Sequence, residues 1–565
     1  MKAVIIISVI IVIASAINVI SAWSTIIGPN SGQLYSSQFS NLSSVKVSAE
    51  STGYQLVVDS HVTANNLTVG IPSKVESTEQ ISIASGKTLT IGDYQPTIFP
   101  GGIISGSGLI MNLSYVTPQM FGAISSTVRD NTIPLQKAII ETESSGGLLY
   151  IPTGTYNHTG LTINRAITIK GDGMLGPWST SWDGPGGGTI LNNIGTGPGL
   201  TIAAQTVSGY TVSCITIEDI ALTSSSYASS HGLVIQGDGG VHNINRVSVM
   251  YAGGHGIYIG GTASTFANTS VVNLTNCIIM SNQRSGIYGR HALNGQINAI
   301  NIMDNQIQAN GTNKAYDAGV NVWGNNINIL RNTIQGNLGT GVMLTAQDVR
   351  GIGSTVQSSV IANVNIQHNY MEINSKGNIQ VRPGYNASTS IYQYIVGLNI
   401  SDNYSYQSSN VVLPGITAHI QFSNYSTNAA IGTIESLTIG KNVYYDDPVH
   451  MMPYVDFGSL AGATSTLEYF ITHTEYYGYG YPASRYINRV GQDGTAVKLV
   501  NVPAMSNYST PGRYWAIGDT IPNSVPSQLG STPNKYIIKG WTRITTGTGN
   551  MLNRDWVENR SHTGN

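Results

Sequence analysis

The stretch His255-Gly256-Ile257-Tyr258-Ile259 contains the pattern that decides the fold, a glycine followed by alternating apolar residues. Related phrases begin at Gly232, Gly286, Gly319, Gly341 and Gly377, so that successive glycines stand 24, 30, 33, 22 and 36 residues apart. A second phrase, apolar alternation closed by an asparagine, lies between them. Its asparagines are Asn276, Asn305, Asn332, Asn369 and Asn403. The chain therefore contains a repeat of two phrases in fixed order, with elastic spacing.

This repeat indicates stacked coils of short strands. Each coil buries its inward Ile, Val or Leu by packing on the coils before and after it. Asparagine at the same corner of successive coils suits a tight left-handed turn. A β-sandwich would also contain many short strands, but not two phrases that alternate in one order. The sequence predicts an all-β protein, a right-handed single-stranded parallel β-helix, with Ile257, Val320, Val342 and Ile379 inside.

Composition restricts the partners. Charged residues make up 10% of the 565 residues and the formal net charge is −2, which argues against nucleic acid as a partner because phosphate binding needs clustered Lys and Arg. A polar, uncharged, tyrosine-rich chain suits sugars. No cluster of aspartates suggests a metal site, and we expect no cofactor. The two cysteines, Cys214 and Cys277, are interpreted as small buried apolar residues, with a disulfide as the alternative.

The N-terminus predicts export. Residues 1–22 contain Lys2, an apolar run from Ala3 to Ile13 and a small-x-small pattern at Ala14-Ser15-Ala16, typical of a signal peptide. An uncleaved membrane anchor is the alternative, and in either case the rest of the chain is extracellular, whether secreted, on a cell surface or on a virion. Thirteen Asn-x-Ser/Thr sequons are compatible with glycosylation, although chance supplies many in so Asn-rich a chain.

The pattern divides the chain into further regions. Residues 24–115 are short-stranded and turn-rich, and form either first coils or a β-rich cap. Residues 116–410 contain the coils, beginning with a helix that Thr132 caps and that places Ile133, Leu135, Ala138, Ile139 and Thr142 at helical spacing. The helix is expected to cover the open apolar end of the solenoid. Residues 411–500 are an aromatic-rich extension, and residues 501–565 a small β module.

The region around this helix resembles the start of pectate-lyase-like β-helix proteins, a superfamily that includes viral tailspikes. The matching segments are Phe121-Gly122-Ala123, Asp130-Asn131-Thr132, Gln136-Lys137-Ala138-Ile139, Gly146-Gly147 and Ile151-Pro152-Thr153-Gly154-Thr155-Tyr156. The usual form has a second aspartate where this chain has Asn131. The resemblance implies the fold and, through the tailspikes, a homotrimer. It does not fix the chemistry, because members are lyases, hydrolases, epimerases and pure binders.

Candidate binding residues point outward from the glycine-led strands. The outward middle positions include Tyr258, Tyr288 and Asn321, with Trp323 and Arg382 two residues further on in their strands. Tyr258 and Tyr288 on neighbouring coils would form a platform on which a sugar ring stacks, and Trp323 would extend it. The alternative is an aromatic ladder that only stabilises the sheet.

Candidate catalytic residues are His255, Arg290, His291 and Asp317. Gly254-His255-Gly256 resembles a short motif of polygalacturonase-like hydrolases, but the other parts of their pattern are missing. His231-Gly232 repeats the phrase one coil earlier, so we expect the two histidines to stack. A glycosidase needs two close carboxylates, and Asp238, Asp317 and Asp348 form no pair on this register. A lyase needs a base and a cation to neutralise a uronate, for which His255, Tyr288, Arg290 and His291 are candidates.

Two hypotheses follow from these residues. The first is an exported polysaccharide-binding protein that also cleaves its ligand, as a lyase or glycosidase, in the manner of a tailspike. The second is a non-enzymatic adhesin or structural spike that binds glycans through the same face. The missing carboxylate pair favours the second hypothesis, and the resemblance to a largely enzymatic superfamily favours the first.

Overall fold

A computed structural model describes 30 segments of the chain. They comprise residues 33–38, 41, 43–44, 46, 55–69, 73–75, 79–91, 97–98, 102–145, 147–176, 188–203, 214–227, 230–236, 240–260, 271–289, 297–312, 317–345, 359–382, 385–386, 391–407, 419–422, 433–440, 442–446, 455–456, 467–471, 475–476, 517–518, 520–522, 527–545 and 552–563. The predicted signal segment 1–22, Arg290 and His291 lie outside them. Within these segments, no helix is both long and apolar enough to span a membrane.

The chain divides into two compact units, Met1–Asp172 and Gly173–Asn565. In the first unit, short strands pair in parallel along three sides, as β2–β5–β8, β3–β6–β9 and β4–β7–β10. The described strands between Gln55 and Met111 therefore form coils. These strands are β2 (Gln55–Val58), β3 (Val62–Ala64), β4 (Leu67–Val69), β5 (Ser73–Val75), β6 (Gln80–Ile83), β7 (Thr88–Ile91), β8 (Thr97–Ile98), β9 (Ile103–Gly106) and β10 (Leu109–Met111).

The helix α3 (Thr132–Ser145) follows these coils. Leu135, Ala138, Ile139 and Thr142 are buried as predicted, but Ile133 is 83% exposed because it lies on the opposite face of the first turn. Thr132 is not the cap. The carbonyl of Asn131 accepts the N–H of Leu135 over 3.0 Å, which makes Asn131 the N-cap residue.

Polar side chains of α3 complete the edges of the strands that it covers. Gln136 pairs with the backbone of Thr162 in β15 (Leu161–Ile163) through bonds of 2.8 and 2.9 Å. Toward β10, the fully buried Glu141 accepts the N–H of Ile110 over 3.0 Å. Lys137 forms an ion pair with Glu141 at 2.5 Å. An open strand edge would leave buried backbone groups unpaired, so α3 caps the coils through hydrogen bonds as well as apolar packing.

Asn131 occupies the position at which the resembled family usually has aspartate. Its side-chain oxygen accepts the N–H of Ile124 over 2.9 Å. Its amide nitrogen donates to the carbonyls of Ile124 and Arg129, at 3.1 and 3.2 Å. A carboxylate has no proton to donate to either carbonyl, so the amide suits this buried turn.

The remaining strands of the first unit lie before and after the helix. They are β1 (Gln33–Tyr35), β11 (Tyr115–Val116), β12 (Ser126–Asp130), β13 (Leu148–Ile151), β14 (Gly154–His158) and β16 (Thr168–Gly171).

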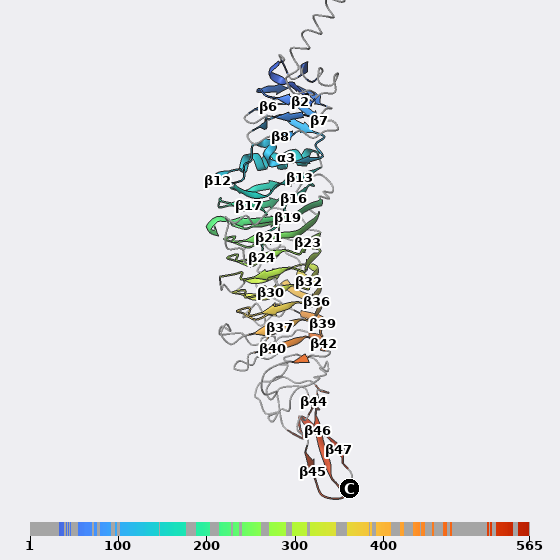
Figure 1. Cartoon of the computed structure of the whole chain (residues 1–565). Coiled ribbons are helices and arrows are strands. Elements are labelled where there is room, and N and C mark those ends of the chain that lie inside the picture. Colours follow the sequence, from blue (N-terminus) through green and yellow to red (C-terminus); the bar gives the residue numbers. More distant parts are fainter. Residues whose placement is uncertain are drawn as a thin grey trace, which may run out of the picture. The chain divides into compact units, whose positions relative to one another are not determined.

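In the second unit the coils continue as stacked parallel strands (Figure 1). One side, which we call the glycine-led sheet, contains the repeats that begin with glycine. Its strands are β18 (Leu200–Ile202), β20 (Leu233–Ile235), β22 (Ile257–Ile259), β25 (Ile287–Gly289), β28 (Ala318–Val322), β31 (Thr340–Thr345), β34 (Ile379–Arg382), β38 (Ile420–Phe422) and β41 (Val455–Asp456).

The other strands of this unit complete the coils. They are β17 (Thr189–Asn193), β19 (Cys214–Ser224), β21 (Val241–Met250), β23 (Val271–Thr275), β24 (Ile278–Met280), β26 (Ile300–Met303), β27 (Gln306–Gln308), β29 (Asn325–Leu330), β30 (Thr333–Gln335), β32 (Ser359–Gln367), β33 (Tyr370–Glu372), β35 (Tyr385–Asn386), β36 (Ile391–Ser401), β37 (Tyr404–Gln407), β39 (Thr433–Ile439), β40 (Val443–Asp446), β42 (Leu467–Ile471) and β43 (Glu475–Tyr476). The fold is the right-handed parallel β-helix that the repeat predicted.

The core has the predicted register. Ile257, Val320 and Val342 are completely buried and Ile379 is 3% exposed. Cys277 is buried, as interpreted, whereas Cys214 is exposed at the start of β19. Both thiols are free, so the disulfide alternative is wrong.

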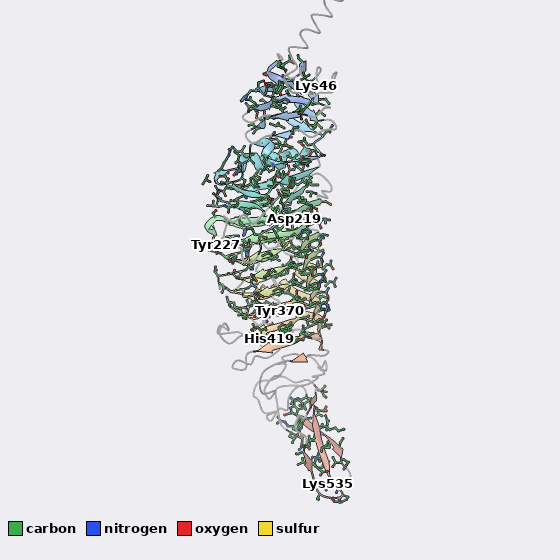
Figure 2. The ribbon with its side chains drawn as sticks, in the orientation of Figure 1. Lys46, Asp219, Tyr227, Tyr370, His419 and Lys535 are labelled. Carbon is green, nitrogen blue, oxygen red and sulfur yellow. The ribbon has the colours of Figure 1, made fainter. Side chains whose placement is uncertain are left out.

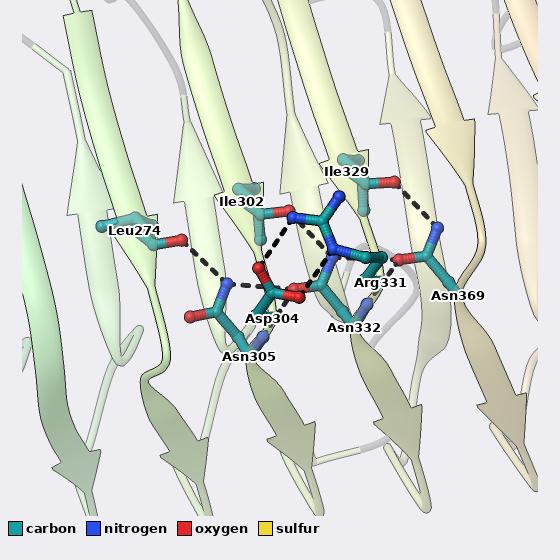
Figure 3. Close-up of polar contacts among 8 residues, drawn as sticks. All are labelled: Leu274, Ile302, Asp304, Asn305, Ile329, Arg331, Asn332 and Asn369. Atoms are coloured by element: carbon teal, nitrogen blue, oxygen red, sulfur yellow. Dashed lines mark hydrogen bonds and ion pairs between the residues drawn. The ribbon is translucent and has the colours of Figure 1, made fainter.

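Asparagines bond to one another between coils and form a buried ladder. The Nδ2 atoms of Asn305 and Asn332 donate to the Oδ1 atoms of Asn332 and Asn369, over 3.0 and 2.9 Å (Figure 3). The ladder continues through Asn403 and Asn442. The left-handed residue of each corner is the one before the ladder position, such as Asp304 at φ 60° and Arg331 at φ 54°. The expectation that the asparagine itself adopts this conformation holds only at Asn276, where Cys277 occupies the ladder position.

A second buried ladder of asparagines packs against the glycines of the first phrase. It runs through Asn282, Asn310, Asn337 and Asn374. A Cβ atom added to Gly286 would lie 2.8 Å from the Nδ2 atom of Asn310. The same conflict arises between Gly256 and Asn282, at 2.6 Å. Each glycine leaves room for the side-chain amide of the ladder asparagine in the next coil.

Two sequons occupy these ladders. Asn310 is completely buried and Asn403 is 2% exposed, and the amides of both are hydrogen-bonded. These sites are closed to glycosylation in the folded chain.

The C-terminal strands form a small antiparallel sheet. Within the described residues, β46 (Tyr536–Arg543) pairs with β44 (Thr520–Pro522), β45 (Gln528–Leu529) and β47 (Trp556–His562). The Arg543 guanidinium carbon lies 5.3 Å from the ring centroid of Trp556, and each side chain is 1% exposed.

Candidate functional site

The outward register of the glycine-led sheet agrees with the sequence prediction. Val234 pairs with Tyr258, Tyr258 with Tyr288, Tyr288 with Asn321, Asn321 with Met343, and Met343 with Gln380. Of the candidate binding residues, Tyr258, Tyr288 and Asn321 thus occupy one continuous line across successive coils, whereas Trp323 and Arg382 lie off it.

Four aromatic side chains, His231, His255, Tyr258 and Tyr288, form what we call the ring cluster. The ring of Tyr258 stacks on His231 at a centroid distance of 5.0 Å, and that of Tyr288 stacks on His255 at 4.2 Å. The predicted stacking of the two histidines is also present, at 5.4 Å with planes 17° apart. Tyr258 and Tyr288 are 5.8 Å apart. The tyrosines are thus supported by imidazoles instead of forming a platform by themselves.

Both histidines are held in the neutral form. Burial, followed by the charge of Arg284, lowers the pKa of His231 to about 4. The Nδ1 atom of His231 accepts the backbone N–H of His255 over 3.1 Å, so the proton of the neutral ring is on Nε2. Burial also lowers the pKa of His255 well below its ordinary value, with further contributions from His231 and Arg284. The Nδ1 atom of His255 is buried and has no hydrogen-bond partner among the described residues.

A buried ion pair lies beside the ring cluster. The Nε atom of Arg284 is 2.7 Å from an oxygen of Asp317, whose side chain is completely buried. The other carboxylate oxygen accepts the N–H of Thr312 over 3.1 Å. Lys376 is close enough for Asp317 and Arg382 to influence its pKa, which burial lowers overall. Asp317 thus joins Arg284 to Thr312 and also acts on Lys376.

Other predicted site residues have different surroundings. Trp323 is 7% exposed, so it does not extend an exposed platform. It follows the last residue of β28, and the chain then turns at Gly324, whose φ is 153°. Asn321 is 6% exposed, and its amide donates to the sulfur of Met343 at 3.7 Å. Arg382 ends β34 and is partly exposed. Arg290 and His291 lie outside the described residues.

The arrangement restricts the chemistry of this site. Asp317 is completely buried and both of its oxygens are engaged, one by the Arg284 guanidinium and the other by the N–H of Thr312, so it is poorly placed to reach a glycosidic oxygen. No group of three His, Cys, Asp or Glu side chains within the described segments is arranged to hold a metal ion. The ring cluster instead provides aromatic edges, phenol groups and two uncharged imidazoles beside a cation.

The residue that sequence reasoning missed is Arg284. It stands two positions before Gly286, in the turn that enters β25, where no period predicts a side-chain direction. Its partner Asp317 lies 33 residues later, at the equivalent turn of the next coil. The spacing of one coil is the signal that would have linked them.

No protein-family model matches this sequence, and no curated protein does. Solved structures with similar coils include the A-module of mannuronan C-5 epimerase AlgE4 from Azotobacter vinelandii, at 15% identity and a TM-score of 0.37, covering 66% of this chain and 99% of that one. The Dettilon tailspike protein gp208 has 14% identity and a TM-score of 0.43, with coverages of 77% and 79%.

A third structure is the tailspike gp49 of Acinetobacter baumannii bacteriophage Fri1, a capsular polysaccharide depolymerase. It has 11% identity, coverages of 80% and 80%, and a TM-score of 0.39. At these values the likeness is one of fold, the parallel β-helix, and carries no information on activity.

Proposed function

We propose that this chain is an exported β-helix protein that binds surface polysaccharide through the ring cluster. The observation that carries the proposal is the packing of Tyr258 and Tyr288 on His231 and His255, beside Arg284. Aromatic side chains provide flat apolar surface at low conformational cost, and sugars have apolar C–H faces that pack against it. Each tyrosine ring lies against the imidazole on which it stacks.

The charge of the site indicates which class of glycan it prefers. The histidines are neutral, and the Arg284 guanidinium lies close enough to both to lower their pKa values. An arginine fork binds vicinal hydroxyls or a carboxylate. The ring cluster therefore suits a glycan chain that carries hydroxyl-rich or acidic residues.

The test is incubation of the whole chain with purified capsular, lipopolysaccharide and cell-wall glycans. Retention of a glycan that is lost in the Tyr258→Ala, Tyr288→Ala double variant supports the proposal. Equal retention of the glycan by the wild type and the double variant would contradict the proposal. The same incubations report on cleavage, through the length of the recovered glycan chains.

A second candidate function is β-elimination of an acidic polysaccharide, with His255 as the base. It is favoured by the neutral imidazole of His255 and by its buried, unpartnered Nδ1. The base would take the proton from the carbon next to the uronate carboxylate. The bond to the glycosidic oxygen then breaks, that oxygen gains a proton, and a carbon–carbon double bond forms in the sugar. Ultraviolet absorbance of the unsaturated product distinguishes this reaction from hydrolysis and from binding alone.

The setting that fits best is the surface of a virion or cell. Tailspike-type proteins assemble as homotrimers, and we extend that assembly to this chain by resemblance alone. A non-enzymatic adhesin uses the same ring cluster without the elimination step. If a glycan binds but yields no shortened or unsaturated product, the result favours a non-enzymatic adhesin.

A further inference from the structure

A different face of the second unit carries outward side chains that the ring cluster does not use. On strands β27, β30, β33 and β37 these side chains form two rows. In the first row Gln306 pairs with Thr333, Thr333 with Tyr370, and Tyr370 with Tyr404. In the second, Gln308 pairs with Gln335, Gln335 with Glu372, and Glu372 with Tyr406. Tyr370 is labelled in Figure 2.

Tyr370 is the first aromatic residue in its row. Its ring stacks on Tyr404 with centroids 5.2 Å apart and planes 4° apart. On its other side the register places Thr333, whose side chain is much shorter than a phenol ring. Tyr370 is nevertheless 38% exposed. One face of this ring is therefore covered by Tyr404, and the opposite face stands above Thr333.

The Tyr370 ring is held in place at its hydroxyl. That hydroxyl donates to Oε2 of Glu372 over 2.8 Å. Burial and the neighbouring carboxylate raise the pKa of Tyr370 to about 12, so the donor keeps its proton at ordinary pH. A ring fixed both by stacking and by a hydrogen bond loses little freedom when a ligand packs on it.

One polar group of the second row lacks a partner within the described segments. Gln308 is 2% exposed, and its Oε1 accepts from Gln306 over 2.9 Å. Its Nε2 is buried and has no hydrogen-bond partner. A buried amide donor without a partner costs free energy, which a ligand acceptor would recover. The amide of Gln335 and the second oxygen of Glu372 add a donor and an acceptor next to it.

We infer that Tyr370, Thr333, Gln335, Glu372 and Gln308 form a second saccharide site, specific for neutral sugars and separate from the ring cluster. A sugar ring stacks on the Tyr370 face above Thr333 while its hydroxyls bond to the amides and to Glu372. The only charged side chain in the two rows is the Glu372 carboxylate. It accepts hydrogen bonds from sugar hydroxyls and repels the carboxylate of a uronate. This inference does not require glycan binding at the ring cluster.

The experiment uses the whole chain carrying Tyr258→Ala and Tyr288→Ala, so that the ring cluster contributes no binding. Saturation-transfer NMR with cellohexaose, mannohexaose and maltohexaose then reports binding at the second site. We expect at least one of them to bind, and Tyr370→Ala to weaken that binding roughly tenfold, as expected for loss of one stacking ring. Tyr370→Phe keeps the ring face and should bind more tightly than Tyr370→Ala.

Thr333→Tyr is the variant that does not depend on the stability of Tyr370→Ala. It extends the tyrosine row by one ring, covers the Tyr370 face, and should weaken binding as much as Tyr370→Ala does. Tyr227→Ala, at a tyrosine that is 39% exposed elsewhere in the unit, is the matched control and should change nothing. The inference is overturned if no hexasaccharide binds, or if binding is unchanged in both Tyr370→Ala and Thr333→Tyr.

Discussion

The backbone N–H of His255 donates to the Nδ1 atom of His231 across 3.1 Å, so the two coils are joined at the ring cluster by a bond that requires a neutral imidazole. Protonation of Nδ1 would replace the acceptor with a donor. The hydrogen bond and the stack of rings above it therefore depend on pH.

The pH dependence has a defined direction. The folded-state pKa of His231, about 4, lies below the ordinary value of 6.5, so the unfolded chain binds protons more readily. The stability that the neutral ring provides is complete above about pH 6.5 and decreases as the pH falls toward about 4. His231→Asn keeps an acceptor that does not titrate, and denaturation curves measured across this range should change less with pH. His158, whose pKa is also about 4, and His255, whose pKa burial lowers, stay in both proteins and set the residual slope. Identical slopes would show that His231 does not titrate on unfolding.

Removing both tyrosines of the ring cluster tests the glycan site. Tyr258→Ala with Tyr288→Ala should weaken binding of the cognate glycan at least roughly tenfold, about 1.4 kcal/mol, because two stacked rings are lost. Isothermal titration measures the change, and circular dichroism checks that the coils persist. Tyr227→Ala is the control for loss of an exposed tyrosine. An unchanged dissociation constant would move the site elsewhere.

Asparagines of one coil allow a matched test of the buried ladder. Asn332→Ala removes four hydrogen bonds, leaving the amide of Asn305 and the carbonyl of Ile302 without their partner. We expect a loss of about 3 kcal/mol or more in unfolding free energy. Asn328→Ala, in a half-buried outward ladder, loses its bonds to Asn301 and Asn365 where water can replace them, and should cost about 1 kcal/mol. Equal losses in urea denaturation would contradict the special role of the buried ladder.

The core register is tested by a buried charge. Ile257→Asp places a carboxylate at a completely buried position and should cost several kcal/mol, because no partner there offsets desolvation. Ile257→Val is the conservative control. A soluble aspartate variant with the melting temperature of the wild type would show that residue 257 does not face the core.

The assembly proposed by resemblance has a direct measurement. Multi-angle light scattering of the mature protein should give three times the mass of one chain. A monomer mass would remove the trimer and with it much of the support for a tailspike role.

The line from Val234 to Gln380 could be predicted because strand alternation has a fixed period of two and each strand begins with a recognisable glycine. The stacking of His231 on His255 followed from the same repeat. Both depend only on local pattern and on the stacking of equal coils.

Residues at the corners could not be predicted in the same way. Trp323 lies just after β28, where the chain turns at Gly324 and the alternation no longer gives the direction of a side chain. Arg284 lies in a turn and acts through Asp317, which belongs to another coil. Ile133 was misplaced because a helix buries about half of its surface and its first turn was assigned to the wrong face. Tertiary contacts determine the side-chain environment of all three residues.

The close approach of each glycine to the asparagine of the following coil has an evolutionary consequence. Because Gly286 and Asn310 fit together across a coil boundary, neither can change alone without a clash or an empty space. Adding or removing one whole coil leaves every glycine with a matching asparagine in the next coil. A break inside a coil separates the glycine from its asparagine. The β-helix of the second unit can therefore gain or lose length by recombination in whole coils.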